Sequence, residues 1–335
     1  MEYQVPILKQ NYKVLVRCFT FNQSKYIEDA LNGFVMQKTN FPFICAIVDD
    51  CSTDGEQDVI KSYLNTEFNM ESAESYETDY ANIIVAVHKT NVNCSFAVFF
   101  LKYNHYSIKK TKSPYLQPIR DVCSYEAMCE GDDYWTYPLK LQTQVDFLDS
   151  HEDVVVSCHQ YSFLYENDKT ITTYPYKYFE QNPQEEFFLF NLKYNFFLNW
   201  KTKTLTCVIR ISKLDPDFCK NARYHRDVHV MYDLLRKGNG VCHSFLGGVY
   251  RKNQGGIFGS LNPIEQAKKN YEVYKEFAEL EPTPFLKRLA NEYKLRYKAK
   301  LSIFGKIRLK VHDSFYYLRT GRHLGDLPFL DNDKY

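Results

Sequence analysis

The chain changes repeatedly from a short apolar run to an amphipathic helical pattern, and this limits the fold more than any other feature. Residues 14–20 and 43–48 are largely apolar runs of strand length, and the second has no polar face, as in a strand covered on both sides. Apolar side chains then recur at near-helical spacing over residues 27–35 and 59–64, and residues 83–87 supply a third apolar run. This β-α-β-α-β order predicts a doubly wound α/β domain with a mostly parallel sheet.

Acidic side chains gather directly after two of the predicted strands. Asp49 and Asp50 end the run at 43–48, and the sequence EGDD at 130–133 follows the apolar residues 125–129. Open α/β sheets bind ligands at the carboxyl ends of their strands. Mg²⁺ and Mn²⁺ prefer carboxylate oxygens and readily share substrate phosphates. The sequence therefore predicts a metal–diphosphate site at this edge of the sheet, with a solvated acidic turn as the alternative.

Several other classes of binding protein lack support. No G-x-G-x-x-G motif follows the first predicted strand and the chain has no P-loop motif, which removes most support for dinucleotide binding and for P-loop ATP binding. The 42 Lys and Arg residues nearly balance the 41 Asp and Glu residues, so the net charge of +1 makes no case for a nucleic-acid partner.

The cysteines and the amino-terminal residues bear on the cellular compartment. Ten cysteines include no C-x-x-C pair, and several lie in apolar runs, where cysteine acts as a small hydrophobic residue. Residues 1–13 show no signal-peptide pattern, and no run reaches the roughly 20 apolar residues of a membrane-spanning helix. We therefore expect a cytoplasmic protein with reduced thiols.

The order of several short motifs resembles that of the family 2 inverting glycosyltransferases, which have the GT-A fold and use nucleotide-activated sugars. The resemblance implies a GT-A type, doubly wound, mixed but mostly parallel sheet flanked by helices. It also implies a UDP-type donor, a divalent metal (Mn²⁺ or Mg²⁺) held by the acidic motif, and one carboxylate acting as base. The motifs are Thr20-Phe21-Asn22, Gln37, VDDCSTDG at 48–55, and EGDDYW at 130–135 with Pro138, Leu139 and Leu141 behind it.

The resemblance also divides the chain. It covers about residues 13–260, so we expect a catalytic domain at 1–260 and a basic, helical carboxyl-terminal extension at 261–335. Within the catalytic domain, about residues 13–150 would form the nucleotide-binding half and about residues 151–260 the acceptor half.

Base recognition is assigned through the resemblance to the loops after the first two strands. Thr20 and Phe21, followed by Asn22, stand where the family's first loop meets the base, and the family usually has Tyr at the Phe21 position. Asp50 stands where a carboxylate reads the uracil imide. These four residues are the expected base-binding set.

The acidic motif and a later strand supply the remaining donor contacts that the resemblance implies. Asp132 and Asp133 match the motif that contacts ribose and metal, and the spacing permits either as the direct metal ligand. Arg251 or Lys252 would meet the diphosphate. Many relatives carry His near Asn253, where it completes the metal shell, and the asparagine offers an oxygen instead.

Asp227 is the candidate general base. Apolar residues at helical spacing over 228–235 and the Arg-Lys-Gly sequence at 236–238 predict a helix that begins near Asp227. The resemblance implies that this carboxylate deprotonates the acceptor hydroxyl. His225 and His229 are four residues apart and supply an alternative, a shared metal, although no Glu lies between them as in H-E-x-x-H.

The remaining segments carry weaker expectations. Residues 91–120 are predicted to be polar and irregular, either a basic loop over the diphosphate or a solvated insertion. Residues 154–158 and 202–210 are strand candidates, and residues 184–197 are a helix candidate. Between residues 287 and 322 the chain has 11 basic and 2 acidic residues, a local charge of +9 (11 − 2), with apolar and aromatic residues interleaved. This pattern fits a peripheral contact with the inner face of a membrane or a helical tail packed on the catalytic domain.

The leading functional prediction is a glycosyltransferase of the hexosyltransferase type. It would move a sugar from a nucleotide-diphospho-sugar to a hydroxyl of a glycan or lipid-linked acceptor, in the synthesis of a cell-surface polysaccharide. Two alternatives stay open, a nucleotidyltransferase and a non-catalytic nucleotide- or sugar-binding module. The first usually needs a glycine-rich basic loop after strand one, where this chain has TFNQ.

Overall fold

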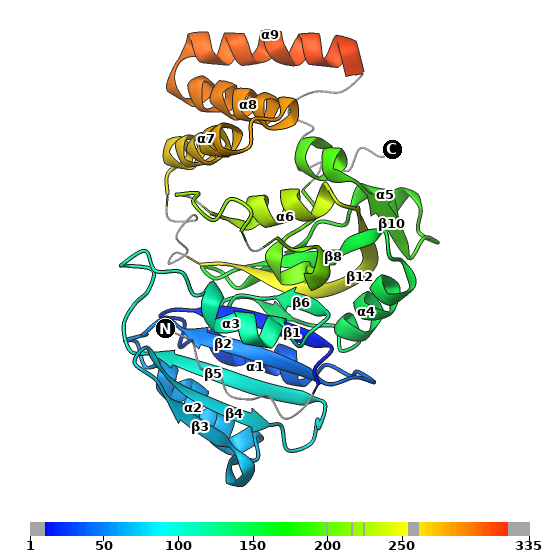
Figure 1. Ribbon diagram of the computed structural model, residues 1–335. Helices are drawn as coiled ribbons and strands as arrows, with labels where there is room; N and C mark the ends of the chain where they lie inside the picture. Colours follow the sequence, from blue (N-terminus) through cyan, green and yellow to red (C-terminus); the bar gives the residue numbers. More distant parts are fainter. Residues whose placement is uncertain (1–10, 199, 216, 224, 254–260, 321–335) are drawn as a thin grey trace.

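The computed structural model describes residues 11–198, 200–215, 217–223, 225–253 and 261–320 (Figure 1). Its centre is a mixed sheet of 12 strands, in which β7 (Tyr134–Trp135) pairs with β12 and β9 (Thr170–Thr173) pairs with β8. The other strands follow the spatial order β10 (Phe187–Phe190), β12 (Asn239–Lys252), β8 (Val154–Tyr165), β11 (Val208–Arg210), β6 (Tyr125–Met128), β1 (Val14–Thr20), β2 (Phe43–Asp49), β5 (Cys94–Leu101), β4 (Ala81–Val87) and β3 (Glu74–Glu77).

The parallel part of the sheet lies at its centre. Strands β6, β1, β2 and β5 run parallel, as do β8 and β12, whereas β11 is antiparallel to both of its neighbours. This agrees with a mixed sheet flanked by helices. The helices are α1 (Ile27–Val35), α2 (Glu56–Glu67), α3 (Ser113–Arg120), α4 (Lys140–Ser150), α5 (Lys177–Gln181), α6 (Asp227–Leu235), α7 (Pro263–Leu280), α8 (Pro284–Leu301) and α9 (Ile303–Thr320).

Alternate side chains of β1 and β2 face opposite sides of the sheet. Val14 and Val16 pack with α1 and α2 in one core, whereas Leu15 and Val48 pack with α3 in another. Both sides are covered because apolar side chains face each side of these strands, and each fully buried Val or Leu contributes about 1.5–3 kcal/mol. The loops that follow β1, β2 and β6 consequently start from well-packed strands at one edge of the sheet.

One strand assignment needs correction. The third parallel strand is β5, within the segment 91–120 that was expected to be irregular, and the apolar run at 83–87 belongs to β4. Strand β4 is antiparallel to β5 on its outer side. Both runs are apolar, and the local pattern carries no information on strand direction or on which run pairs with β2. Strand β5, which is buried along its whole length, is the strand that pairs with β2.

Residues 151–260 depart from the expected elements at two places. Residues 184–197 contain strand β10 and the start of a short helical turn at Tyr194–Leu198 instead of one helix. Residues 202–210 form a strand only at Val208–Arg210. Strand β10 pairs at the sheet edge with β12, and its alternating burial reflects one face turned to solvent. Such pairing involves residues about 50 positions apart, which local helical spacing cannot report.

The helices that follow residue 260 stack at the end of the molecule beyond α6, with α9 outermost (Figure 1). Tyr274 and Phe277 of α7 and Leu286 of α8 share a core with Met231 and Tyr232 of α6. Asn262 caps α7 and Thr283 caps α8 through side-chain hydrogen bonds to backbone amides. Among the described helices, none combines the length and the apolar character that crossing a bilayer requires.

Candidate active site

The loop after β1 is tied to the loop after β2. The Asn22 carboxamide oxygen accepts from the Thr53 amide at 2.8 Å, and the Asn22 amide donates to the Ser52 hydroxyl at 2.8 Å. Asn22 adopts a left-handed φ of +53°, a conformation that asparagine tolerates better than most residues. The Thr20 hydroxyl contacts the buried Glu56 carboxylate. Phe21, at the tip, is 43% exposed, so its ring is available to a ligand.

Asp50 is buried and its carboxylate is bound by residues of the next loop. One oxygen accepts from the His105 amide at 2.7 Å, and the other accepts from the Tyr106 amide at 3.1 Å and from Lys112 Nζ at 2.8 Å. The resemblance predicted that Asp50 contacts the nucleotide base of the donor. In this structure the carboxylate orders residues 105–112, and a base would have to displace Lys112 to reach it.

The acidic loop between β6 and β7 meets the β1 loop at Gly131. A Cβ on Gly131 would lie 2.3 Å from the Thr20 hydroxyl oxygen and 2.6 Å from Gln23 Oε1, so no side chain fits there. This close approach fixes Asp132 and Asp133 at the same edge of the sheet as the predicted base-binding loop.

The carboxylates of the acidic loop have few positive partners. Burial raises the pKa of Asp132, and burial followed by the charge of Asp132 raises the pKa of Asp133 well above its usual range. Burial also raises the pKa of Glu130, which Arg17 opposes from 3.3 Å. Such a cluster is stabilised by an added cation or by protonation.

Arg251 holds the acidic loop in place. Its backbone amide donates to Asp133 Oδ1 at 2.8 Å, and its Nε donates to the Asp132 carbonyl oxygen at 2.8 Å. Its terminal nitrogens form ion pairs with Asp29, at 2.6 Å, and with Glu166. The resemblance assigned Arg251 or Lys252 to the diphosphate, and in the structure the Arg251 guanidinium contacts oxygens of the protein itself.

The residues at Asp132 fit a hard divalent cation. Asn253 Nδ2 donates to Asp132 Oδ2 at 3.0 Å, and Asn253 Oδ1 is buried without a hydrogen-bond partner among the described residues. A buried oxygen with no donor beside an under-neutralised carboxylate is a suitable ligand for Mg²⁺ or Mn²⁺. Within the described ranges, no three His, Cys, Asp or Glu residues group as metal ligands. Amide or substrate oxygens would therefore complete the shell.

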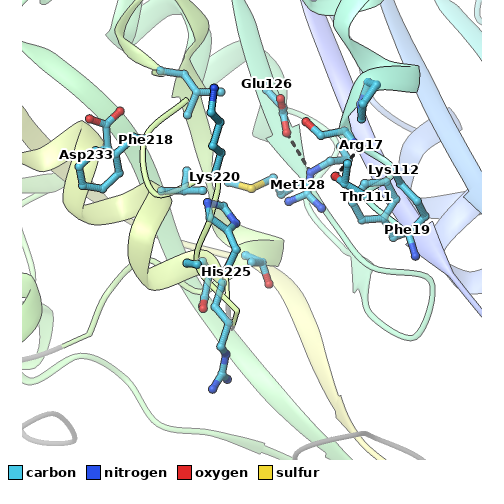
Figure 2. Close-up of a pocket in the computed structure, with 18 of the residues that line it drawn as sticks. Arg17, Phe19, Thr111, Lys112, Glu126, Met128, Phe218, Lys220, His225 and Asp233 are labelled. Atoms are coloured by element: carbon cyan, nitrogen blue, oxygen red, sulfur yellow. Dashed lines mark hydrogen bonds and ion pairs between the residues drawn. The ribbon is translucent and has the colours of Figure 1, made fainter. Parts of the chain in front are cut away.

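A cavity of about 1490 Å³ lies between the sheet and the segment that contains α6. Asp227 and Glu130 both line it. Asp227 is the first residue of α6, as predicted, and its carboxylate accepts from the Val228 amide at 3.0 Å. Figure 2 shows the opposing walls, with Arg17, Phe19, Thr111, Lys112 and Glu126 on one side, Phe218, Lys220, His225 and Asp233 on the other, and Met128 between them.

Lys203 and Tyr250 lie close enough to both the acidic loop and Asp227 to be influenced by their charges. Lys203 Nζ lies 4.4 Å from the centroid of the Tyr250 ring. Burial lowers the pKa of Lys203, and the charges of Asp227 and Asp133 oppose that shift. Burial raises the pKa of Tyr250, and the charges of Asp133, Asp132 and Asp227 raise it further. Carboxylates from two separate elements therefore act on the same two side chains.

The cavity wall formed by the sheet contains a charged cluster that the sequence motifs did not indicate. Glu126 lies between Arg17, whose Nε is 2.9 Å away, and Arg120, whose Nε is 2.6 Å away. Burial opposes ionisation of Glu126, but the Arg120 and Arg17 charges lower its pKa overall. The sequence did contain a sign of this cluster, because Arg17 in β1 and Glu126 in β6 are single charged residues inside otherwise apolar strands.

Among the described residues, no third His, Cys, Asp or Glu joins His225 and His229 at the alternative metal site. The His225 and His229 rings stack with centroids 5.2 Å apart, and His229 Nδ1 accepts from the Arg226 amide at 3.1 Å. This ring nitrogen is therefore used to cap the helix.

Comparison with solved structures shows the fold. S. aureus TarS, residues 1–349 in complex with UDP-GlcNAc, aligns with a TM-score of 0.53 and 17% identity over 86% of this chain and 73% of that chain. The predicted resemblance in fold is thereby confirmed, and the chain has the fold of the GT-A glycosyltransferases. The mannosyltransferase PcManGT from Pyrobaculum calidifontis, in complex with GDP-Man and Mn²⁺, aligns with a TM-score of 0.48 and 11% identity over 93% of this chain and 82% of that chain.

Comparison of sequences adds two uncharacterized relatives. No family model matches the chain. The uncharacterized proteins Rv1520 of Mycobacterium tuberculosis and Mb1547 of Mycobacterium bovis are each 34% identical to it over 156 residues, or 47% of this chain. The chain spans 37% of the length of these curated relatives.

Proposed function

We propose that the protein is an inverting, metal-dependent glycosyltransferase of the hexosyltransferase type. A nucleotide-diphospho-sugar, expected to be a UDP-sugar, is the donor. A hydroxyl of a glycan or of a lipid-linked glycan is the acceptor, and the product belongs to a cell-surface polysaccharide. The observation that carries the proposal is the buried Asp132–Asn253 pair, with the unpartnered Asn253 oxygen, next to Glu130, which lines the same cavity as Asp227. The GT-A fold shared with a protein bound to UDP-GlcNAc supports it.

The residues at the strand ends would bind the donor. The exposed Phe21 ring is suited to stacking on the base, and Asp50 would read the base edge once Lys112 moves to the diphosphate. Asp132 and Asn253 would hold a divalent cation, which supplies charge neutralisation to the departing nucleoside diphosphate. In this proposal Arg251 positions the acidic loop and does not contact the donor.

Asp227 would act as general base at the cavity wall. A base must lie within hydrogen-bond reach of the hydroxyl it deprotonates. The acceptor oxygen loses its proton to Asp227 as it bonds to the anomeric carbon, while the bond from that carbon to the diphosphate oxygen breaks. Attack from the face opposite the leaving group inverts the anomeric configuration. Lys203 lies where it can balance the carboxylate charges before the reaction.

Thermal unfolding with UDP, GDP, CDP or ADP, each with Mn²⁺, Mg²⁺ or EDTA, tests donor binding. A ligand that binds only the folded chain raises the melting temperature by mass action. We expect a metal-dependent rise with UDP. No rise with any nucleotide would overturn the proposal, whereas a rise without turnover of any UDP-sugar would favour a binding module. Pyrophosphate release from a nucleoside triphosphate would favour a nucleotidyltransferase.

Substitution of the base tests the transfer step. Asp227→Asn should keep the UDP-dependent rise and reduce turnover of a UDP-sugar about 10²- to 10⁴-fold. Asp58→Asn, at an 87% exposed carboxylate on α2, is the matched control. Near-normal turnover by Asp227→Asn would remove this residue from the mechanism.

A further inference from the structure

Helix α9 turns a continuous apolar stripe toward solvent. Phe304 and Leu318 are each 80% exposed, and Phe315 is 70% exposed. With Ile307 and Val311, which are also exposed, they follow one another at spacings of 3, 4, 4 and 3 residues. Side chains three or four residues apart share one face of a helix. The stripe therefore runs along most of the 18-residue helix.

The opposite face of α9 packs on α8. A Cβ on Gly305 would lie 2.0 Å from the Lys298 carbonyl oxygen, which shows how closely the two helices approach. Leu309, one turn further on, packs against the core shared by α6, α7 and α8. The stripe is thus not the face that α9 uses to fold, and α9 is the outermost helix of the stack (Figure 1).

Exposed basic residues flank the stripe on both edges. At helical spacing Arg308 lies on one edge and Lys310 on the other, Lys306 lies further round the helix beyond Lys310, and all three are exposed. Residues 287–315 contain nine basic and two acidic residues, which gives a local charge of +7 (9 − 2). One of the two acids, Glu292, is buried and paired with Arg288.

We propose that α9 lies on the surface of an anionic membrane, with the stripe at the level of the acyl chains and the flanking cations among the headgroups. An apolar face edged by Lys and Arg is the pattern of helices that bind in the plane of the interface. A second copy of the chain would bring two strongly basic surfaces together, which electrostatic repulsion disfavours. The inference deepens the proposed function by giving the enzyme a place beside a lipid-linked acceptor. It concerns a surface separate from the donor site.

Vesicle flotation of the full chain tests the proposal. Phosphatidylcholine vesicles with phosphatidylglycerol should bind the protein, and phosphatidylcholine alone should bind it about tenfold more weakly. Ile307→Glu with Phe315→Glu should reduce binding to the anionic vesicles at least about tenfold. The charge variant Lys306→Gln with Arg308→Gln and Lys310→Gln keeps the stripe and should bind the anionic vesicles more weakly and with a smaller dependence on salt. Ile171→Glu, at an exposed apolar residue of β9, is the control.

A second measurement reports insertion directly. The emission of Phe315→Trp should shift to shorter wavelength with anionic vesicles, and that of Ile171→Trp should not. Equal flotation of the Ile307→Glu/Phe315→Glu variant and the unaltered chain would overturn the proposal. So would a dimer in sedimentation without lipid that the same substitutions dissociate, because the stripe would then bind a second copy. The rise in melting temperature with UDP should be the same in all these variants. If the unaltered chain shows no such rise, that result counts against the proposed donor site and leaves the membrane proposal to the flotation test.

Discussion

Asn253 and Asp132 lie side by side in the acidic centre, with Asn253 Nδ2 3.0 Å from Asp132 Oδ2 and Asn253 Oδ1 buried and without a partner among the described residues. A buried acceptor of this kind costs about 1–3 kcal/mol unless a donor or a cation reaches it. The pair is therefore the part of the site that a divalent cation would stabilise most directly.

Asn253→Ala should weaken metal binding without unfolding the protein. The substitution removes the unpartnered oxygen, which is the proposed metal ligand. We expect the Mn²⁺ concentration for half of the UDP-dependent thermal rise to increase about 10- to 100-fold. Asn182→Ala, at an exposed asparagine beyond α5, is the control. An unchanged Mn²⁺ dependence would show that Asn253 is not a ligand.

Gly131→Ala should impair donor binding more than folding. The added methyl group would meet the Thr20 hydroxyl oxygen at 2.3 Å, so the acidic loop and the β1 loop must separate. Overpacking of this kind typically costs about 1–3 kcal/mol. We expect the variant to fold with a lower melting temperature and to lose the rise with UDP and Mn²⁺. Gly55→Ala is a useful comparison, because its Cβ would meet nothing within 4 Å and only its φ of +91° opposes the change.

Arg251→Lys should destabilise the acidic loop although the charge is kept. A lysine ammonium cannot contact the Asp132 carbonyl, Asp29 and Glu166 in the forked arrangement of a guanidinium. Loss of partners for buried charges costs about 3–5 kcal/mol, so we expect about half of that for a charge-conserving change. Urea unfolding measures the loss. Arg236→Lys, directly after α6, should cost less, because Arg236 is 34% exposed and Lys237 also pairs with its partner Asp233. Equal losses would contradict this assignment of Arg251.

Lys140 should make stability depend on pH. Its ammonium group is buried over the Trp135 ring, 4.1 Å from the centroid, and burial lowers its pKa to about 7. Above that pKa the unfolded chain still carries the proton and the folded chain does not, so the free energy of unfolding rises with pH. The slope for one such group is about 1.4 kcal/mol per pH unit.

Comparison with Lys140→Met isolates this contribution. The unfolding free energy of the unaltered chain should approach that of Lys140→Met, or overtake it, as pH rises from about 7.5 to about 9. Below about pH 6 the two should run parallel, because the lysine is protonated in both states. Urea unfolding followed by tryptophan fluorescence gives both curves, and parallel curves over the whole range would show that Lys140 keeps its ordinary pKa.

The sequence by itself determined the features that depend on neighbours along the chain. The strands at β1 and β2, the acidic loop after β6 and the start of α6 at Asp227 all follow from short runs of residues and their spacing. Runs of this length encode burial and helix termini locally, because apolar periodicity and turn residues act within a few positions. The resemblance in fold rested on the same short runs.

Only the tertiary structure decided which groups face one another. The Arg251 guanidinium meets Asp29 across 222 positions of sequence, and Asp50 meets Lys112 across 62. The choice of β5 over β4 as the partner of β2 likewise depends on which buried strand fits between its neighbours. Ion pairs and strand pairing depend on distance in space, and the spacing of residue types along the chain carries no measure of that distance.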